Sequence, residues 1–145
     1  MNRLTVYLAG AMSGLTYKEM NQWRKNVKKE FKIANGYYGT NVKIINPVDY
    51  YNYEEIKHQT EMEVMAFDLY KVRHSNILVI NTKGLNSSIG TAIEIYEAYK
   101  RNIPVIALDE NNIYEELHPW LQCCISRHEN TIHDLTEYIM NFYVN

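Results

Sequence analysis

Short apolar runs alternate with longer stretches of helical periodicity along this chain. Four runs have the length of strands and are rich in Val, Ile and Leu: residues 3–9, 42–45, 77–80 and 104–108. Helices are predicted over residues 16–33, 53–74, 88–100 and 131–143, and residues 111–127 fit neither pattern clearly. In the first of these helices, Thr16 and Glu19 have the spacing of a capping box, which marks a helix start.

This alternation predicts a parallel sheet between two layers of helices. Continuous apolar strands are typical of a sheet that is buried on both faces, and right-handed crossovers place helices on each side. We therefore expect a three-layer, doubly wound α/β fold with a mainly parallel sheet of about five strands, of the flavodoxin-like or Rossmann-like kind. With 145 residues and no evident repeat or linker, the chain is expected to form one domain over residues 1–145.

Composition and charge limit the kinds of partner that this chain is expected to bind. The net charge is −2, and the basic residues are scattered except for Lys25, Lys28 and Lys29 on one predicted helix, so no nucleic-acid groove is expected. No apolar stretch is as long as a membrane span, and no signal-peptide pattern precedes the first strand. We expect a soluble, cytoplasmic protein that binds neither nucleic acid nor membrane.

Neither cysteine nor histidine spacing indicates a metal site. Cys123 and Cys124 are adjacent, which does not match zinc-ligand spacing, and we expect them to be buried thiols. No two of the five histidines are four positions apart on a helix. The sequence therefore predicts no metal and no cofactor.

Two polar loops follow predicted strands and are expected to lie together. In a doubly wound sheet, ligands bind beyond the carboxyl ends of the strands, near the point where the strand order reverses. The loops there are Gly10-Ala11-Met12-Ser13-Gly14 and residues 82–88. The glycines of the first loop permit close approach of a small ligand, although a purely structural turn is the alternative.

The second loop opens a helix that carries a carboxylate. A helix start offers unpaired N–H groups and a partial positive charge, which suit an anion such as phosphate. Glu94 lies in the second turn, with Gly90 and Thr91 one turn before it and Ala98 one turn after it. These small neighbours leave a recess for a substrate, whereas the alternative is a solvated glutamate on a helix surface.

Asp68 is a second carboxylate in an unusual position. It lies one turn from Val64 and Val72, at the margin of an apolar stripe, where a charge is costly unless it has a partner. A boundary position or an ion pair with Lys71 or Arg73 would also explain it. Two carboxylates in one pocket suit glycosidic chemistry, because one can attack the anomeric carbon while the other handles the proton of the leaving group.

Three segments in this order resemble the nucleoside 2-deoxyribosyltransferase superfamily. They are Tyr7-Leu8-Ala9-Gly10, Asp68, and Ser88-Ile89-Gly90-Thr91-Ala92-Ile93-Glu94, within a likeness that spans roughly residues 3–108. The resemblance implies that Glu94 attacks C1′ of the sugar, that Asp68 serves the base or the leaving-group proton, and that Tyr7 holds the glutamate. A core tyrosine with a satisfied hydroxyl is the alternative for Tyr7. The residues that we expect to contact the substrate are Gly10, Ala11, Met12, Ser13, Asn46, Ser87, Ser88 and Gly90.

The family contains base-exchanging transferases and hydrolases of nucleoside 5′-monophosphates. Transferases tend to carry an acidic residue six positions before the nucleophile, and this chain has Ser88 there, which is compatible with a phosphate. The chain thus looks more similar to the 2′-deoxynucleoside 5′-phosphate N-hydrolases. Those hydrolases usually carry an arginine in the first loop, where this chain has Ser13, which leaves Lys18 or Arg24 as a substitute.

The resemblance also implies a homodimer or a larger homo-oligomer in which a neighbouring subunit closes the pocket. His118-Pro119-Trp120 is a candidate closing element or, equally, a packed connector, and Tyr50, Tyr51 and Tyr53 are candidates to line the base pocket or to cover the sheet edge. Cleavage of the N-glycosidic bond of a nucleoside 5′-monophosphate, with water as acceptor, is the favoured hypothesis. The alternatives are base exchange, cleavage of a nicotinamide–ribose bond, and a non-catalytic nucleotide-binding module.

Overall fold

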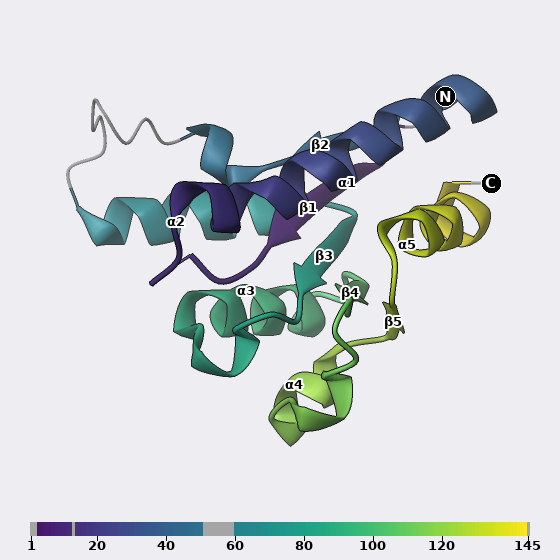
Figure 1. The fold of residues 1–145 in the computed structure, drawn as a ribbon. Helices are drawn as coiled ribbons and strands as arrows, with labels where there is room; N and C mark the ends of the chain where they lie inside the picture. The colour runs from purple at the N-terminus through teal and green to yellow at the C-terminus, as the bar shows by residue number, and fades with distance from the viewer. Residues whose placement is uncertain (1–2, 13, 51–59, 145) are drawn as a thin grey trace.

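The computed structural model describes residues 3–12, 14–50 and 60–144. Within them, parallel strands form a five-stranded sheet in the order β2-β1-β3-β4-β5 (Figure 1). The strands are β1 (Thr5–Ala9), β2 (Lys43–Ile45), β3 (Ile77–Asn81), β4 (Val105–Leu108) and β5 (Arg127–Glu129). The predicted α/β fold class, with a parallel sheet of five strands, is confirmed.

The described residues also form five α-helices and four shorter helical segments. The α-helices are α1 (Tyr17–Tyr38), α2 (Glu61–Arg73), α3 (Ile89–Lys100), α4 (Pro119–Cys124) and α5 (Ile132–Ile139). The 3-10 turns are η1 (Pro47–Tyr50), η2 (Leu85–Ser87) and η3 (Tyr114–Glu116), and a π-helical turn, η4 (Met140–Val144), continues α5. None of the described helices is both long and apolar enough to span a membrane.

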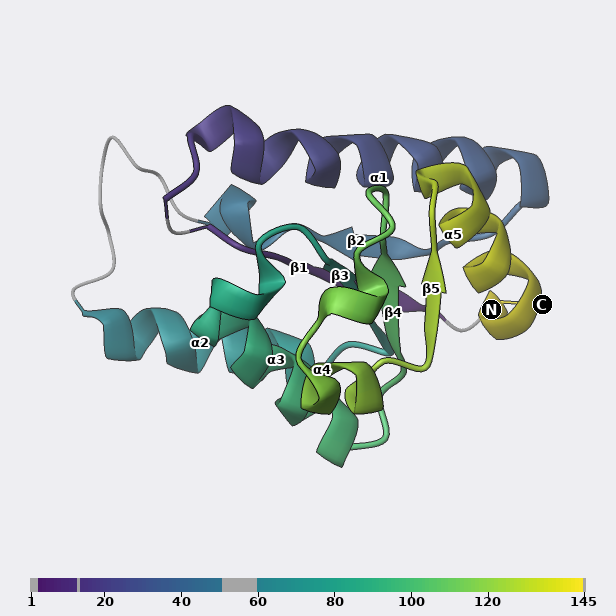
Figure 2. The same ribbon diagram turned by 60° about the horizontal axis from the view of Figure 1, so that its bottom comes forward.

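The helices cover the two faces of the sheet. Figure 2 shows α1 and α5 on one side of the strands and α2, α3 and α4 on the other. Successive residues of a strand point to opposite faces, so β1 supplies both cores. Val6 and Leu8 pack toward α1 and α5, whereas Tyr7 and Ala9 pack toward α2 and α3.

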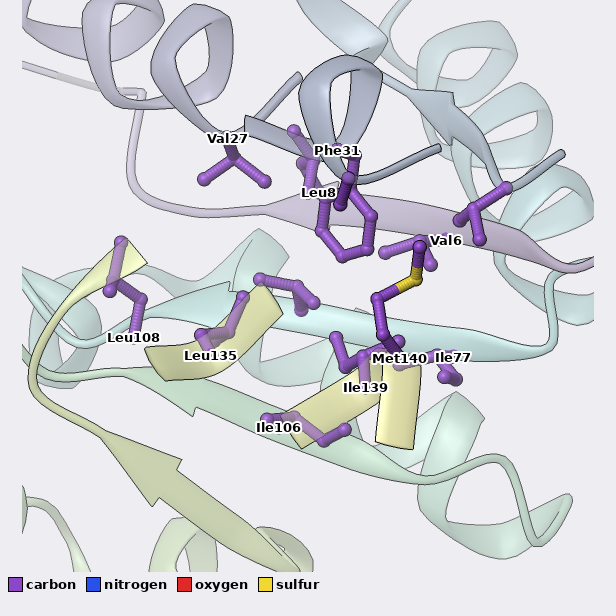
Figure 3. Packing of buried hydrophobic residues seen from close by; sticks show 13 residues of the cluster. Val6, Leu8, Val27, Phe31, Ile77, Ile106, Leu108, Leu135, Ile139 and Met140 are labelled. Atoms are coloured by element: carbon purple, nitrogen blue, oxygen red, sulfur yellow. The ribbon is translucent and has the colours of Figure 1, made fainter. Parts of the chain in front are cut away.

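The buried side chains of the core beneath α1 and α5 are all apolar, and most of them are aliphatic. Figure 3 shows Phe31 of α1 and Leu135 and Ile139 of α5 packed over strand residues such as Leu8 and Ile106. All five side chains have no exposed surface. At roughly 1.5–3 kcal/mol for each large apolar side chain that is buried, this layer contributes much of the driving force for folding.

The topology creates a switch point at β1. The chain passes from β1 to β2 on one side and then returns to place β3 on the other side of β1. The crossovers therefore diverge there, and the loops at the carboxyl ends of β1 and β3 lie side by side, as the sequence predicts. An added Cβ on Gly84, in the β3 loop, would lie 3.3 Å from the Cβ of Ala11, in the β1 loop.

Several element boundaries differ from the predictions. α1 continues to Tyr38 and ends where Gly39 adopts a left-handed conformation with φ of 67°. α2 begins after its capping residue Thr60, and the predicted helical residues 53–59 lie outside the described residues. α5 gives way to a π-helical turn at Met140.

The ambiguous residues 111–127 contain η3 and α4. The interpretation of both cysteines as buried thiols is wrong for Cys123, which is exposed, while Cys124 is half-buried. The physical reason is that α4 is only six residues long and buries none of its side chains completely.

Candidate active site

Tyr7 and Glu94 meet on the face of the sheet covered by α2 and α3. Tyr7 lies on the central strand β1 and has no exposed surface, because its position in the strand points toward α3. Its hydroxyl donates a 2.6 Å hydrogen bond to Oε2 of Glu94. Glu94 itself is half-buried in the second turn of α3, and this bond holds its carboxylate against β1.

The pKa of the Glu94 carboxyl group lies near neutrality. Burial raises the pKa of its carboxyl group to about 7, against the hydrogen bond from Tyr7, which lowers it. The charge of Asp68 raises this pKa further, and the charge of Arg24 lowers it. Because burial dominates, the tyrosine bond offsets only part of the cost of keeping the group ionised.

Asp68 lies on α2 and is half-buried beside the same site. Its charge acts on both Glu94 and Tyr50, which brings it near the pair formed by Tyr7 and Glu94. The nearby Arg73 donates a 2.8 Å hydrogen bond to Glu97, in a separate ion-pair cluster at the far end of α3. The structure therefore brings the two predicted carboxylates and the predicted tyrosine to one place.

The first glycine-containing loop follows β1 at the carboxyl-end edge of the sheet. Gly10 is buried at the end of β1, and Ala11 and Met12 are half-buried beyond it. The carbonyl of Met12 accepts a 3.2 Å bond from the N–H of Leu15, which closes the turn that leads to α1. Ser13, the fourth predicted contact in this loop, lies outside the described residues.

Arg24, which the sequence offers as a substitute for a first-loop arginine, lies next to this loop. It lies on α1, is completely buried, and donates hydrogen bonds to the carbonyls of Met20 and, at 3.1 Å, Gly10. Its position in the buried stripe of α1, one turn before Val27, was the available signal. Such burial rules it out as an exposed substitute for a first-loop arginine.

The start of α3 keeps its backbone N–H groups free of a side-chain cap. Ser88 is the capping residue, but its Oγ bonds to Oγ1 of Thr91 at 2.7 Å instead of to the backbone. Ser87 is exposed, and open space surrounds the position where Gly90 would carry a Cβ. These features are compatible with an anionic group at this helix start.

Asn46 is placed differently from the other predicted contacts. Its side chain is buried, and its amide nitrogen donates to Oδ1 of Asn21 at 2.8 Å. Its amide oxygen accepts from the N–H of Val48 at 3.1 Å. The group therefore ties the end of β2 to α1, which favours a structural role.

The aromatic candidates occupy two different surfaces. Tyr50 is about half exposed and lies near Asp68, as a residue of a base pocket would, while Tyr51 and Tyr53 lie outside the described residues. Trp120 is 79% exposed and lines a groove of about 830 Å³ between α2, α3 and α4. The described lining of this groove includes Ser88 but not Glu94, so Trp120 does not close the site of its own chain.

The arrangement can support attack on an electrophilic carbon. A carboxylate with a pKa near neutrality is available as a nucleophile, a phenol orients it, and a second carboxylate stands beside it. Among the described residues, no three side chains of the His, Cys, Asp and Glu types gather as a metal site.

Comparison with known proteins supports the fold. No family model matches the sequence, and no curated protein matches it either. A conserved protein of Enterococcus faecalis V583 superposes with a TM-score of 0.71 and 19% identity over 97% of this chain and 99% of the other.

Two structures of characterised enzymes are also similar. The 2-deoxyribosyltransferase of Bacillus psychrosaccharolyticus has a TM-score of 0.66 and 14% identity over 92% of this chain and 91% of the other. The CMP N-glycosidase of Clostridium botulinum has a TM-score of 0.53 and 15% identity over 95% and 99%. The chain therefore shares the fold of a 2-deoxyribosyltransferase and of a CMP N-glycosidase.

Proposed function

We propose that this protein is an enzyme that cleaves the N-glycosidic bond of a nucleoside 5′-monophosphate. Glu94 is the nucleophile, Asp68 serves the leaving base, Tyr7 orients the glutamate, and water is the final acceptor. The observation that carries the proposal is the 2.6 Å hydrogen bond from Tyr7 to Glu94, beside Asp68 at the switch point of the sheet. A raised pKa, together with a buried hydrogen-bond donor at the switch point, is typical of a carboxylate with a catalytic role.

The reaction proceeds in two balanced steps. An ionised oxygen of Glu94 attacks C1′, the bond from C1′ to the base nitrogen breaks, and the base leaves with a proton that Asp68 provides. Water then attacks C1′ of the glycosyl ester and gives a proton to Asp68, which releases Glu94 as a carboxylate. The charge of each carboxylate disfavours ionisation of the other, so the pair can carry one proton, which the first step requires on Asp68 and not on Glu94.

The preference for a 5′-phosphate rests on the start of α3. Ser88 adds no negative charge there, and its hydroxyl leaves the backbone N–H groups of the first turn uncapped. A phosphate is stabilised at such a helix start by the N–H groups and the helix dipole. The similarity to a glycosidase whose name specifies CMP points in the same direction.

Base exchange is the second candidate function. It uses the same nucleophile, and the similarity to a 2-deoxyribosyltransferase over most of both chains supports it. The two reactions differ only in whether water or a second base attacks the glycosyl ester. A free acceptor base therefore distinguishes them.

The deciding experiment is product analysis over a panel of nucleosides, their 5′-monophosphates and NAD. We expect free base from at least one 5′-monophosphate, measured by liquid chromatography, and none after Glu94→Gln. Glu110→Gln, which removes an exposed carboxylate beyond β4, is the matched control and should retain activity.

Each other outcome identifies a competing function. A new nucleoside formed with an added base would indicate a transferase, and nicotinamide release would indicate cleavage of NAD. Tight binding by calorimetry without turnover, unchanged by Glu94→Gln, would indicate a binding module. Absence of base release from every compound would refute the enzymatic proposal.

We also infer that a second copy of the chain packs against the groove between α2, α3 and α4. Large apolar side chains are exposed along it, including Met65, Ile89, Tyr96 and Trp120. Contiguous apolar surface of this kind marks interaction sites. Because α3 forms the centre of the groove, two copies related by a two-fold axis can bury the same face, as in most homodimers.

Light scattering coupled to size-exclusion chromatography tests this assembly. The natural chain should elute with the mass of a dimer or a larger oligomer, and Ile93→Glu, in the groove, should reduce that mass to one chain. Tyr37→Glu is the control, because Tyr37 is 83% exposed at the far end of α1. A monomeric natural chain would contradict the inference.

A further inference from the structure

Among the described residues, Arg24 is the largest side chain that is both charged and completely buried. A guanidinium group is protonated at all ordinary pH values, and its burial is costly unless hydrogen bonds and nearby opposite charge compensate for it. Two backbone carbonyls accept from it, those of Met20 within α1 and of Gly10 at the end of β1. Arg24 thus links the helix layer on one face of the sheet to the loop that borders the candidate site.

Trp23 and Arg24 together hold Gly10 in place. A Cβ on Gly10 would lie 2.8 Å from Cζ2 of Trp23 and 3.5 Å from Nη2 of Arg24, so the two side chains close around this glycine. The guanidinium carbon of Arg24 also lies 4.8 Å from the ring centroid of Trp23, a cation–π contact that keeps the pair together. Movement of Gly10 toward α1 is therefore blocked.

The position of Gly10 determines the position of its neighbours in the site. Tyr7, three residues earlier on β1, holds Glu94, and Ala11, one residue later, lies against Gly84 in the loop before α3. A shift of Gly10 would therefore displace both the end of β1, which carries Tyr7, and the loop that leads to α3 and Glu94.

Arg24 also contributes its charge to the site. Three described groups act on Glu94 from three different elements: Tyr7 from β1, Asp68 from α2 and Arg24 from α1. Burial and Asp68 favour the neutral form of Glu94, whereas Tyr7 and Arg24 favour the ionised form. Arg24 is the group among these that carries a full positive charge.

We propose that Arg24 is a positioning residue for Glu94, which it serves from the opposite layer by fixing Gly10 and by placing a buried positive charge at this edge of the sheet. Its role in catalysis rests on the proposed function of Glu94 as nucleophile. The effect of Arg24 on the ionisation of Glu94 does not depend on that function, and it can be measured without substrate.

The test compares Arg24→Gln and Arg24→Lys with the natural protein. The titration of Glu94 is followed by carbon NMR of its carboxyl group, assigned with Glu94→Gln, and kcat/KM for base release is measured against pH. Arg24→Gln should move the titration midpoint and the acidic limb of kcat/KM upward by about one pH unit. Lysine keeps the positive charge but lacks the planar set of N–H donors of a guanidinium group. In Arg24→Lys the titration midpoint of Glu94 should therefore stay near that of the natural protein, while kcat is reduced.

Phe31→Leu is the control for a merely structural role. It opens a small cavity two turns along α1, in the core and away from the site, and should lower Tm without moving the titration of Glu94. If Arg24→Gln also lowered Tm but left both the midpoint and the acidic limb unchanged, the proposal would be overturned.

The remaining outcomes separate this proposal from the proposed function. If the natural protein releases no base, the function fails, and a shifted midpoint in Arg24→Gln still supports the electrostatic part. If Arg24→Gln does not fold, Arg24→Lys decides, because unchanged kcat and KM in that variant would refute a positioning role.

Discussion

The hydroxyl of Tyr7 donates a 2.6 Å hydrogen bond to Glu94 across 87 positions of the chain. Tyr7 lies on β1, which is paired with β2 and β3 on its two sides, and Glu94 lies in the second turn of α3. The bond therefore joins an interior strand of the sheet to the helix that borders the candidate site. It is shorter than most neutral hydrogen bonds, as expected for a bond to a carboxylate.

Replacement of Tyr7 by phenylalanine should destabilise the ionised form of Glu94 relative to the neutral form. The aromatic ring stays in the core, whereas the bond that lowers the pKa of Glu94 is lost. We expect kcat/KM for base release to fall about 10- to 100-fold at pH 7, and its acidic limb to move to higher pH. An unchanged pH profile would mean that the tyrosine bond has no part in the reaction.

Glu94 should also make stability depend on pH. Its pKa is about 7 in the folded protein and near 4.5 in the unfolded chain. Between these values the unfolded state releases a proton that the folded state retains, so stability falls as the pH rises and then levels off above 7. Glu94→Gln removes this dependence.

The gain in stability of Glu94→Gln over the natural protein should therefore be small at pH 4.5 and largest above pH 7. There it should reach on the order of 1–3 kcal/mol. Urea unfolding at pH 4.5, 6 and 8 measures the difference. A gain that does not grow with pH would indicate that the carboxyl group is not held at a raised pKa.

The sequence predicted the architecture well where local chemistry determines it. The capping box at the start of α1 is present, with Thr16 and Glu19 each bonded to the other's backbone N–H at 3.1 and 3.2 Å. The predicted end at residue 33 was too early, because the helix tolerates Gly36 and ends only at Gly39. β5 was not predicted, since its residues Arg127–Glu129 form a short polar edge strand without an apolar pattern.

The candidate site was predictable in its motif residues and not in its supporting ones. Tyr7 and Glu94 belong to segments whose positions after a strand and within a helix start follow from the sequence. Arg24 could not be located, because its acceptor outside α1 is the carbonyl of Gly10, a contact that only the folded chain creates. Asn46 follows a strand as a ligand-binding residue would, yet its partners on α1 become evident only in three dimensions.

Substitution of Gly10 by alanine should disturb the first loop. The added Cβ would lie 2.8 Å from the ring of Trp23, so either the loop or the indole must move. We expect a loss of about 1–3 kcal/mol in the free energy of unfolding, together with reduced kcat/KM. Gly36→Ala, in the open interior of α1, is the control and should instead stabilise the protein by about 0.5–1 kcal/mol.

Gly90 allows the effect on the substrate to be separated from the effect on the fold. It lies in the first turn of α3, and apart from its chain neighbours and the backbone of its own helix nothing lies within 4 Å of an added Cβ, so Gly90→Ala should not lower Tm. If the sugar phosphate binds against this helix start, however, the extra methyl group fills space that the substrate needs. We expect KM for the preferred 5′-monophosphate to rise and kcat/KM to fall about 10- to 100-fold, since a single methyl group in a binding pocket has an effect of this size. Steady-state kinetics with a thermal melt of the same sample measures both quantities, and unchanged kinetics would mean that the substrate binds away from the start of α3.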